Sequence, residues 1–224
     1  MSGAVAALAL APAAEADPQV SLHVSLTAAR LGVSIRISDE QTADGVPPPL
    51  RTLTIELPRG AGLSLARSVS VCRPAALRAH GAAGCPASSR VGRGSATLEV
   101  HAGSQTIPEP AVLSMFRGPA LGGRPTLELL GVGHSPLDQR SVSRGVISAS
   151  AQGLQLRISI PPIHSLELEP DASFTAMSLK LGGPGTTVVL PRSCEGAGLP
   201  FGAELAFSDG SSAQAAQTVP CLGR

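Results

Sequence analysis

Residues 20–26 read Val-Ser-Leu-His-Val-Ser-Leu, so every second residue is apolar. Residues 33–38 repeat the pattern as Val-Ser-Ile-Arg-Ile-Ser. Successive side chains of a strand point to opposite faces, so a period of two predicts strands with one buried and one solvated face. Such half-buried strands are typical of antiparallel sheets.

The same alternation continues along the chain. Further strands are predicted at residues 53–57, 96–100, 111–116, 126–132, 142–150, 154–160, 174–181, 187–190, 203–207 and 214–219. Connections rich in Gly and Pro separate them, and residues 150–153 and 208–211 have the composition of tight hairpin turns. We expect an all-β fold, a mostly antiparallel β-sandwich.

One stretch is predicted to be helical. Pro74 suits the first turn of a helix, and Gly81 suits its end. The segment between them is long enough for one or two turns only. Such a short helix depends on packing and covalent support.

Four cysteines form two local brackets: Cys72 with Cys85, and Cys194 with Cys221. Neither bracket has the closely spaced pairs of a zinc site, so two disulfides are predicted. Four cysteines allow three connectivities. Local pairing is favoured because each bracket encloses a compact unit, the second one folded back at Asp209-Gly210.

The N-terminus resembles a secretory leader. An apolar run over residues 4–11 precedes Ala14-Glu15-Ala16, an A-x-A-like cleavage site, although no positive charge stands before the run. We expect residues 1–16 to be a signal peptide remnant and residues 17–224 to form a single β-sandwich-like domain. Residues 118–123 are the best candidate for an internal boundary. No later segment is apolar enough to span a membrane. A secreted or extracytoplasmic protein is therefore predicted.

Composition lowers the expectation of several functions. The chain has 224 residues and a net charge of +1, and 43% of its residues are hydrophobic. The near-neutral charge gives no reason to expect nucleic-acid binding. Four Phe and no Trp or Tyr leave few stacking platforms for sugars or bases. The core is expected to be packed from aliphatic side chains.

Candidate chemical groups are few. His134, Ser135 and Asp138 contain the residue types of a catalytic triad, but adjacent positions rarely give its geometry. The carboxylates of Glu167, Glu169 and Asp171 fit a solvated strand face better than a glycosidase or calcium site.

Two further groups are weighed in the same way. Arg140, Arg144 and Arg157 form a small basic set that most simply keeps a sheet face soluble. The five histidines lack zinc-binding spacing. We predict no catalytic, cofactor-binding or metal site.

The cysteines and their flanks resemble a family of uncharacterised secreted β proteins of high-GC Gram-positive bacteria. The first match runs from Leu57-Pro58-Arg59-Gly60 through Cys72-x4-Leu77 to Cys85-Pro86-Ala87-Ser88-Ser89-Arg90-Val91-Gly92. The second runs from Pro191-Arg192-Ser193-Cys194 through Asp209-Gly210 to Pro220-Cys221. The resemblance implies secretion but no activity.

Three classes of function remain. The expected one is a secreted, non-catalytic structural or interaction module of the cell envelope, with an envelope protein or glycan as the partner. The alternatives are a glycan- or small-ligand-binding β-sandwich and a secreted hydrolase or lyase. A concave site with convergent polar groups would favour the alternatives.

Overall fold

The computed structural model describes residues 18–27, 30–42, 44–65, 69–166, 169–182, 186–191 and 198–221. The strands are β1 (Gln19–Thr27), β2 (Arg30–Ser38), β3 (Leu50–Pro58), β4 (Gly62–Leu65), β5 (Arg90–Ala102), β6 (Gln105–Arg117), β7 (Thr126–Gly133), β8 (Arg140–Ser150), β9 (Gly153–Ser159), β10 (Ser173–Leu181), β11 (Thr186–Val189), β12 (Leu199–Phe207) and β13 (Ser212–Val219). One short helix, α1 (Pro74–His80), precedes two 3₁₀ turns, Gly81–Gly84 and Ala87–Ser89. The mostly antiparallel β prediction is confirmed.

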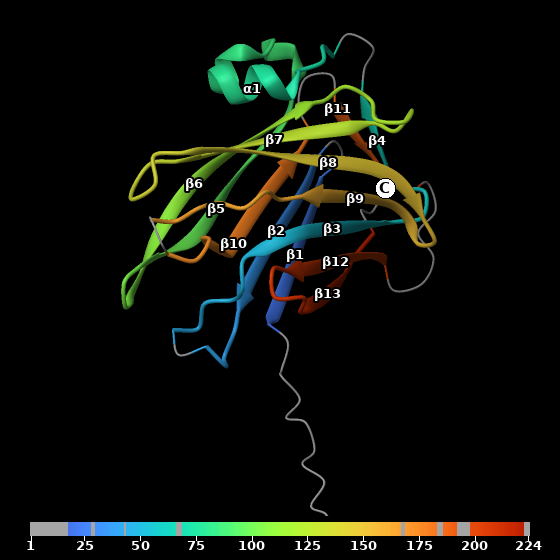
Figure 1. Cartoon of the computed structure of the whole chain (residues 1–224). Coiled ribbons are helices and arrows are strands. Elements are labelled where there is room, and N and C mark those ends of the chain that lie inside the picture. The colour runs from blue at the N-terminus through green and yellow to red at the C-terminus, as the bar shows by residue number, and fades with distance from the viewer. Residues whose placement is uncertain are drawn as a thin grey trace, which may run out of the picture.

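Eleven of these strands form one antiparallel sheet in the order β1-β2-β10-β5-β6-β7-β8-β9-β3-β12-β13. The sheet curls round until its edge strands β1 and β13 lie against each other (Figure 1). Across this seam the Val24 N–H donates to the side-chain Oε1 of Gln217. The result is a nearly closed, barrel-like sheet, where the alternation had suggested two sheets of a sandwich. Alternation specifies one buried face per strand, and it does so equally for a curled sheet and for two facing sheets.

Strands β4 and β11 form a separate two-stranded sheet that covers one end of the barrel. Leu63 and Val188 from this cap pack against the main core. Strand β4 was not predicted, whereas the equally short β11 was predicted at residues 187–190. The two strands come from distant parts of the chain, so their pairing has no local sequence signature.

The opposite end of the barrel is a rim of loops. The β5–β6, β7–β8 and β9–β10 connections lie together at this end, on the left of Figure 1. The predicted hairpin turns are both present: Gly153 begins β9 after the turn from β8, and Gly210 lies in the turn between β12 and β13. Residues 118–125 join two neighbouring strands, β6 and β7, of the same sheet.

The predicted helix is confirmed as α1, with Pro74 in its first turn and Gly81 at its C-cap. Among the described residues no helix has the length and hydropathy needed to cross a membrane. Helix α1 lies on the outside of the barrel (Figure 1). There its fully buried Leu77 packs with Cys72, Phe116 and Leu130 in a second, smaller core.

The Cys72–Cys85 disulfide, with a Cα–Cα distance of 5.2 Å, holds this external layer in place. The Cys72 N–H also donates to the Arg117 carbonyl at 2.8 Å, which ties the bracket to the end of β6. The first predicted disulfide is confirmed. Cys194 lies outside the described residues, so its pairing with Cys221 stays a prediction. Residues 1–16 lie outside them as well.

We predict that the double substitution Cys72→Ala/Cys85→Ala lowers the free energy of unfolding by about 3 kcal/mol, because the closed loop of about 14 residues is released in the unfolded chain. Chemical denaturation checks the free energy, and amide hydrogen exchange is expected to show early opening of α1. Val71→Ala, at an exposed position beside Cys72, is the control. An unchanged unfolding free energy in the double variant would contradict this role of the disulfide.

Candidate functional site

The interior of the barrel is lined by small residues near its rim. On β7 the inward register runs through Leu127, Leu129, Gly131 and Gly133, and on the neighbouring β8 it includes Ser141 and Ser143. Glycine and serine leave space where leucine or isoleucine would fill it. A cavity of about 60 Å³ lies over these four small residues.

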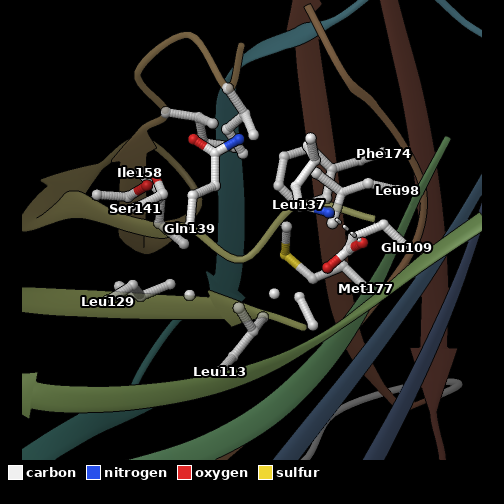
Figure 2. Close-up of a pocket in the computed structure, with 16 residues that line it drawn as sticks. Leu98, Glu109, Leu113, Leu129, Leu137, Gln139, Ser141, Ile158, Phe174 and Met177 are labelled. Atoms are coloured by element: carbon white, nitrogen blue, oxygen red, sulfur yellow. Dashed lines mark hydrogen bonds between the residues drawn. The ribbon is translucent and has the colours of Figure 1, made fainter. Parts of the chain in front are cut away.

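The rest of the cavity wall is mostly aliphatic (Figure 2). Its apolar side chains are Leu98, Ala111, Leu113, Leu129, Leu137, Ile158, Ile160, Ile163, Phe174 and Met177. A water molecule needs two to four polar partners, and this wall offers few. The cavity therefore favours an apolar occupant over water.

Glu109 is the titratable side chain among the described residues of this wall, and it is 2% exposed. Its Oε1 accepts the His134 N–H at 2.6 Å, and its Oε2 accepts the Leu137 N–H at 3.0 Å. Each carboxyl oxygen thus accepts one backbone N–H of the β7–β8 loop. Glu109 thereby holds the β7–β8 loop over the cavity, and Leu137 of that loop forms part of the wall.

Gly133 makes this arrangement possible. A Cβ at this position would overlap Oε1 of Glu109 and would stand 2.7 Å from the Leu137 carbonyl oxygen. Any larger residue would push the carboxylate or the loop away. The Glu109–loop contact thus depends on a glycine at the end of β7.

A polar cluster borders the cavity at the rim. Arg51 Nη2 donates to Asp171 Oδ2 at 2.7 Å, and the His164 ring contacts Asp171 Oδ1 at 2.9 Å. The hydrogen bond from Arg51 holds the pKa of Asp171 below its usual range, with His164 acting in the same direction. Gln139, which lines the cavity, donates to the His164 carbonyl at 2.7 Å. The cluster links the β7–β8 and β9–β10 loops.

The candidate triad is not assembled. The β7–β8 loop places His134, Ser135 and Asp138 at exposed positions. Within the described chain their side chains form no hydrogen bond with one another. The His134 contribution to the site is its backbone N–H. The sequence analysis had judged a triad at these adjacent positions unfavourable, and it did not foresee the contact between this loop and Glu109.

The candidate carboxylates have separate roles. Glu169 accepts the Gly103 N–H at 2.9 Å, while Asp171 belongs to the Arg51 cluster. Glu167 lies outside the described residues. Over the described ranges no group of three or more His, Cys, Asp or Glu side chains is placed to hold a metal ion.

The three candidate arginines lie on strands β8 and β9. Arg144 Nε donates to Glu128 Oε1 at 2.8 Å. Burial raises the pKa of Glu128, and the bond from Arg144 acts against that rise. The Arg144 side chain therefore binds the Glu128 carboxylate on the external face of β7.

Glu109 is the site residue that sequence reasoning missed. It stands in phase with Ala111, Leu113 and Met115, which are all inward-facing on β6. A carboxylate on the apolar face of a predicted strand is the signal that could have revealed it.

Comparisons with known proteins add no relatives to this description. No family model matches the chain, and no curated protein or solved structure is significantly similar to it.

We predict that Glu109→Ala lowers the free energy of unfolding, because the buried Leu137 N–H loses its acceptor at a cost of about 1–3 kcal/mol, and the partly buried His134 N–H loses its acceptor as well. Gly133→Ala is expected to act in the same direction through its overlap with Glu109. Denaturant unfolding measures both, with the exposed Glu204→Ala as the control within about 0.5 kcal/mol of the parent. Equal stability of Glu109→Ala and Glu204→Ala would refute the holding role of Glu109.

The rim cluster predicts a pH dependence. Because the folded-state pKa of Asp171 is lowered, its ionised form stabilises the fold above the usual value of 3.8, and this stabilisation is lost as the pH falls through the lowered value. Asp171→Asn should cost up to about 1 kcal/mol at pH 7, since the pair is partly exposed. The cost should shrink as the pH drops below about 4.

Urea unfolding of both proteins at several pH values measures this cost. Asp138→Asn, at an exposed position on the neighbouring loop, provides the control. A cost for Asp171→Asn that stays constant down to the most acidic pH would contradict the proposed contribution of the ionised carboxylate.

Proposed function

We propose that this protein is an extracytoplasmic, non-catalytic binding module that takes a small apolar ligand, or the apolar end of a larger one, into the cavity beneath its rim. This develops the small-ligand-binding alternative raised by the sequence. The observation that carries the proposal is the cavity itself, where Gly131, Gly133, Ser141 and Ser143 occupy inward positions of two adjacent strands. Ligand sites in β-barrels commonly lie in such mouths.

The chemistry of the wall supports binding over catalysis. Both oxygens of Glu109 are engaged by backbone N–H groups, so the carboxylate is occupied in positioning a loop. No nucleophile–base pair stands beside it among the described residues that line the cavity. Shape and apolar surface are what this site offers a ligand.

A location outside the cytoplasm is supported by the Cys72–Cys85 disulfide, since such bonds persist mainly in oxidising compartments. In the cell envelope an apolar ligand would be at hand in the membrane or its lipids. A carrier or sensor of such a molecule is one form that an envelope interaction module takes.

Filling the cavity from Gly131 tests the proposal. A Cβ there would stand 3.4 Å from Leu113 Cδ2, in van der Waals contact, and the backbone needs no positive φ. We expect the parent protein to bind octan-1-ol with a negative heat-capacity change, the marker of apolar burial. Gly131→Val should weaken this binding by about tenfold or more. The lost apolar burial of two methylenes, at about 0.8 kcal/mol each, is enough to produce this change. Isothermal titration at two temperatures provides the measurement.

Gly202→Val is the matched control. Gly202 is also a strand glycine with room for a Cβ, 3.6 Å from Glu56 Cβ, but it lies on the outward register of β12. It should bind octan-1-ol as the parent does. Ser143→Val serves as a second filling variant if Gly131→Val does not fold. No binding by the parent, or equal binding by the filled and control variants, would refute the proposal.

A further inference from the structure

A second cavity of about 30 Å³ lies deeper in the barrel. Its wall consists of Leu31, Val33, Ile55, Leu57, Gly62, Leu63, Leu127, Ile147, Leu154, Gln155, Leu156, Leu179, Leu181 and Val188. Apart from Gly62 and Gln155, these are aliphatic residues. The deeper cavity is therefore suited to hydrocarbon.

The two cavities are stacked along the barrel. Leu129, Ile158 and Met177 line the first, and the next inward positions on the same three strands line the second. Those positions are Leu127, Leu156 and Leu179. Two residues along a strand span about 6.6 Å, so one layer of side chains separates the cavities.

The stacked cavities end at the cap on one side and at the rim on the other. Leu63 and Val188 of the β4–β11 cap lie at the floor of the deeper cavity. Gln139 and Ile163, both half-buried, lie at the rim side of the first. Met177, which lines the first cavity one inward position from Leu179 of the second, is unbranched and flexible enough to move aside for a chain. A ligand would enter at the rim and extend toward the cap.

Polar atoms at the first cavity define the other end of the ligand. The Ser141 hydroxyl oxygen is buried and, within the described chain, has no hydrogen-bond partner. Buried polar groups normally have one, so this hydroxyl can take a partner from a ligand. Glu109 lines the same cavity and makes no ion pair with a described residue. A ligand carboxylate would lie beside the acceptor oxygens of Glu109, and the described residues of the wall include no Lys or Arg to pair with it.

We infer that the ligand is an amphiphile with one unbranched alkyl chain and a hydrogen-bonding head group that is neutral or cationic. The head lies beside Ser141 and Glu109, and the chain runs past Met177 toward the cap. This inference rests on the proposed function, and the experiments below separate the failure of one from the failure of the other.

The first experiment compares head groups on one chain. Octan-1-ol, octylammonium and octanoate are titrated into the parent protein. Octanoate should bind at least about tenfold more weakly than octan-1-ol, a difference of about 1.4 kcal/mol. In Glu109→Gln the affinity for octan-1-ol should exceed the affinity for octanoate by a smaller factor than in the parent protein. This factor compares two ligands of the same variant, so a general loss of stability does not affect it. Octanoate binding as tightly as octan-1-ol would overturn the head-group inference, whereas no binding of any octyl compound would overturn the proposed function.

The second experiment compares chain lengths from butan-1-ol to octan-1-ol. Affinity should rise about fourfold with each methylene while the chain extends through the barrel, corresponding to about 0.8 kcal/mol. Gly62→Val adds volume beside the deeper cavity, where a Cβ would meet Val189 and Leu154 at 3.8 and 3.9 Å. In this variant the gain in affinity per methylene should stop at a shorter alcohol than in the parent protein, while butan-1-ol binds with unchanged affinity.

Gly202→Val is again the control, and Leu63→Phe, which fills the deeper cavity from the cap, is the second variant if Gly62→Val does not fold. A uniform loss for every alcohol, or no change in the chain-length limit, would overturn the axial path. Equal affinity of the parent protein for butan-1-ol and octan-1-ol would do so as well, and would leave the proposed function intact.

Discussion

Each strand of the main sheet other than the edge strands β1 and β13 has a hydrogen-bonded neighbour on both sides, and this nearly closed pairing is the constraint on which the rest of the molecule depends. Pairing satisfies the backbone, but a curled sheet of eleven strands also encloses an interior that side chains must fill. The chain has four Phe and no Trp or Tyr for this purpose. Three of them, Phe174, Phe201 and Phe207, belong to the interior core. Where the inward positions are glycine and serine, the aliphatic residues opposite do not reach across, and a cavity results.

Strands β6 to β8 are packed on both faces, which explains how a wall of small residues keeps its shape. Their inward residues line the cavity, and their outward residues Phe116 and Leu130 pack beneath Leu77 of α1. Leu129 and Leu130, adjacent in sequence, therefore serve opposite cores. The Cys72–Cys85 disulfide secures the outer layer, so it supports from outside the strands that line the cavity. The external core and the cavity therefore both follow from the alternation of outward and inward side chains along these strands.

Local sequence signals were sufficient for most elements of the fold. Alternation located the twelve longer or more regular strands, and Pro74 and Gly81 delimited α1. The pairing of β2 with β10 and of β9 with β3 joins strands about a hundred or more residues apart, and their alternation is compatible with many partners. For this reason the sandwich was expected and the curled sheet was not. At the candidate site, the β7–β8 loop stood out through its polar residues, but the groups that contact Glu109 are backbone N–H groups, which no side-chain motif encodes.

An empty cavity lowers the stability of the folded protein. At about 24 cal/mol per Å³, an empty space of about 60 Å³ lowers stability by about 1.4 kcal/mol. At Gly131 the backbone would accept a side chain, because its φ is not in the left-handed region and a Cβ would meet its neighbour at 3.4 Å. Steric necessity therefore explains Gly133, whose Cβ would overlap Glu109, but it does not explain Gly131. A ligand that occupies the space would recover the lost contacts in the bound state. This difference between the two glycines of β7 is the strongest structural reason to regard the cavity as a binding site and not as imperfect packing.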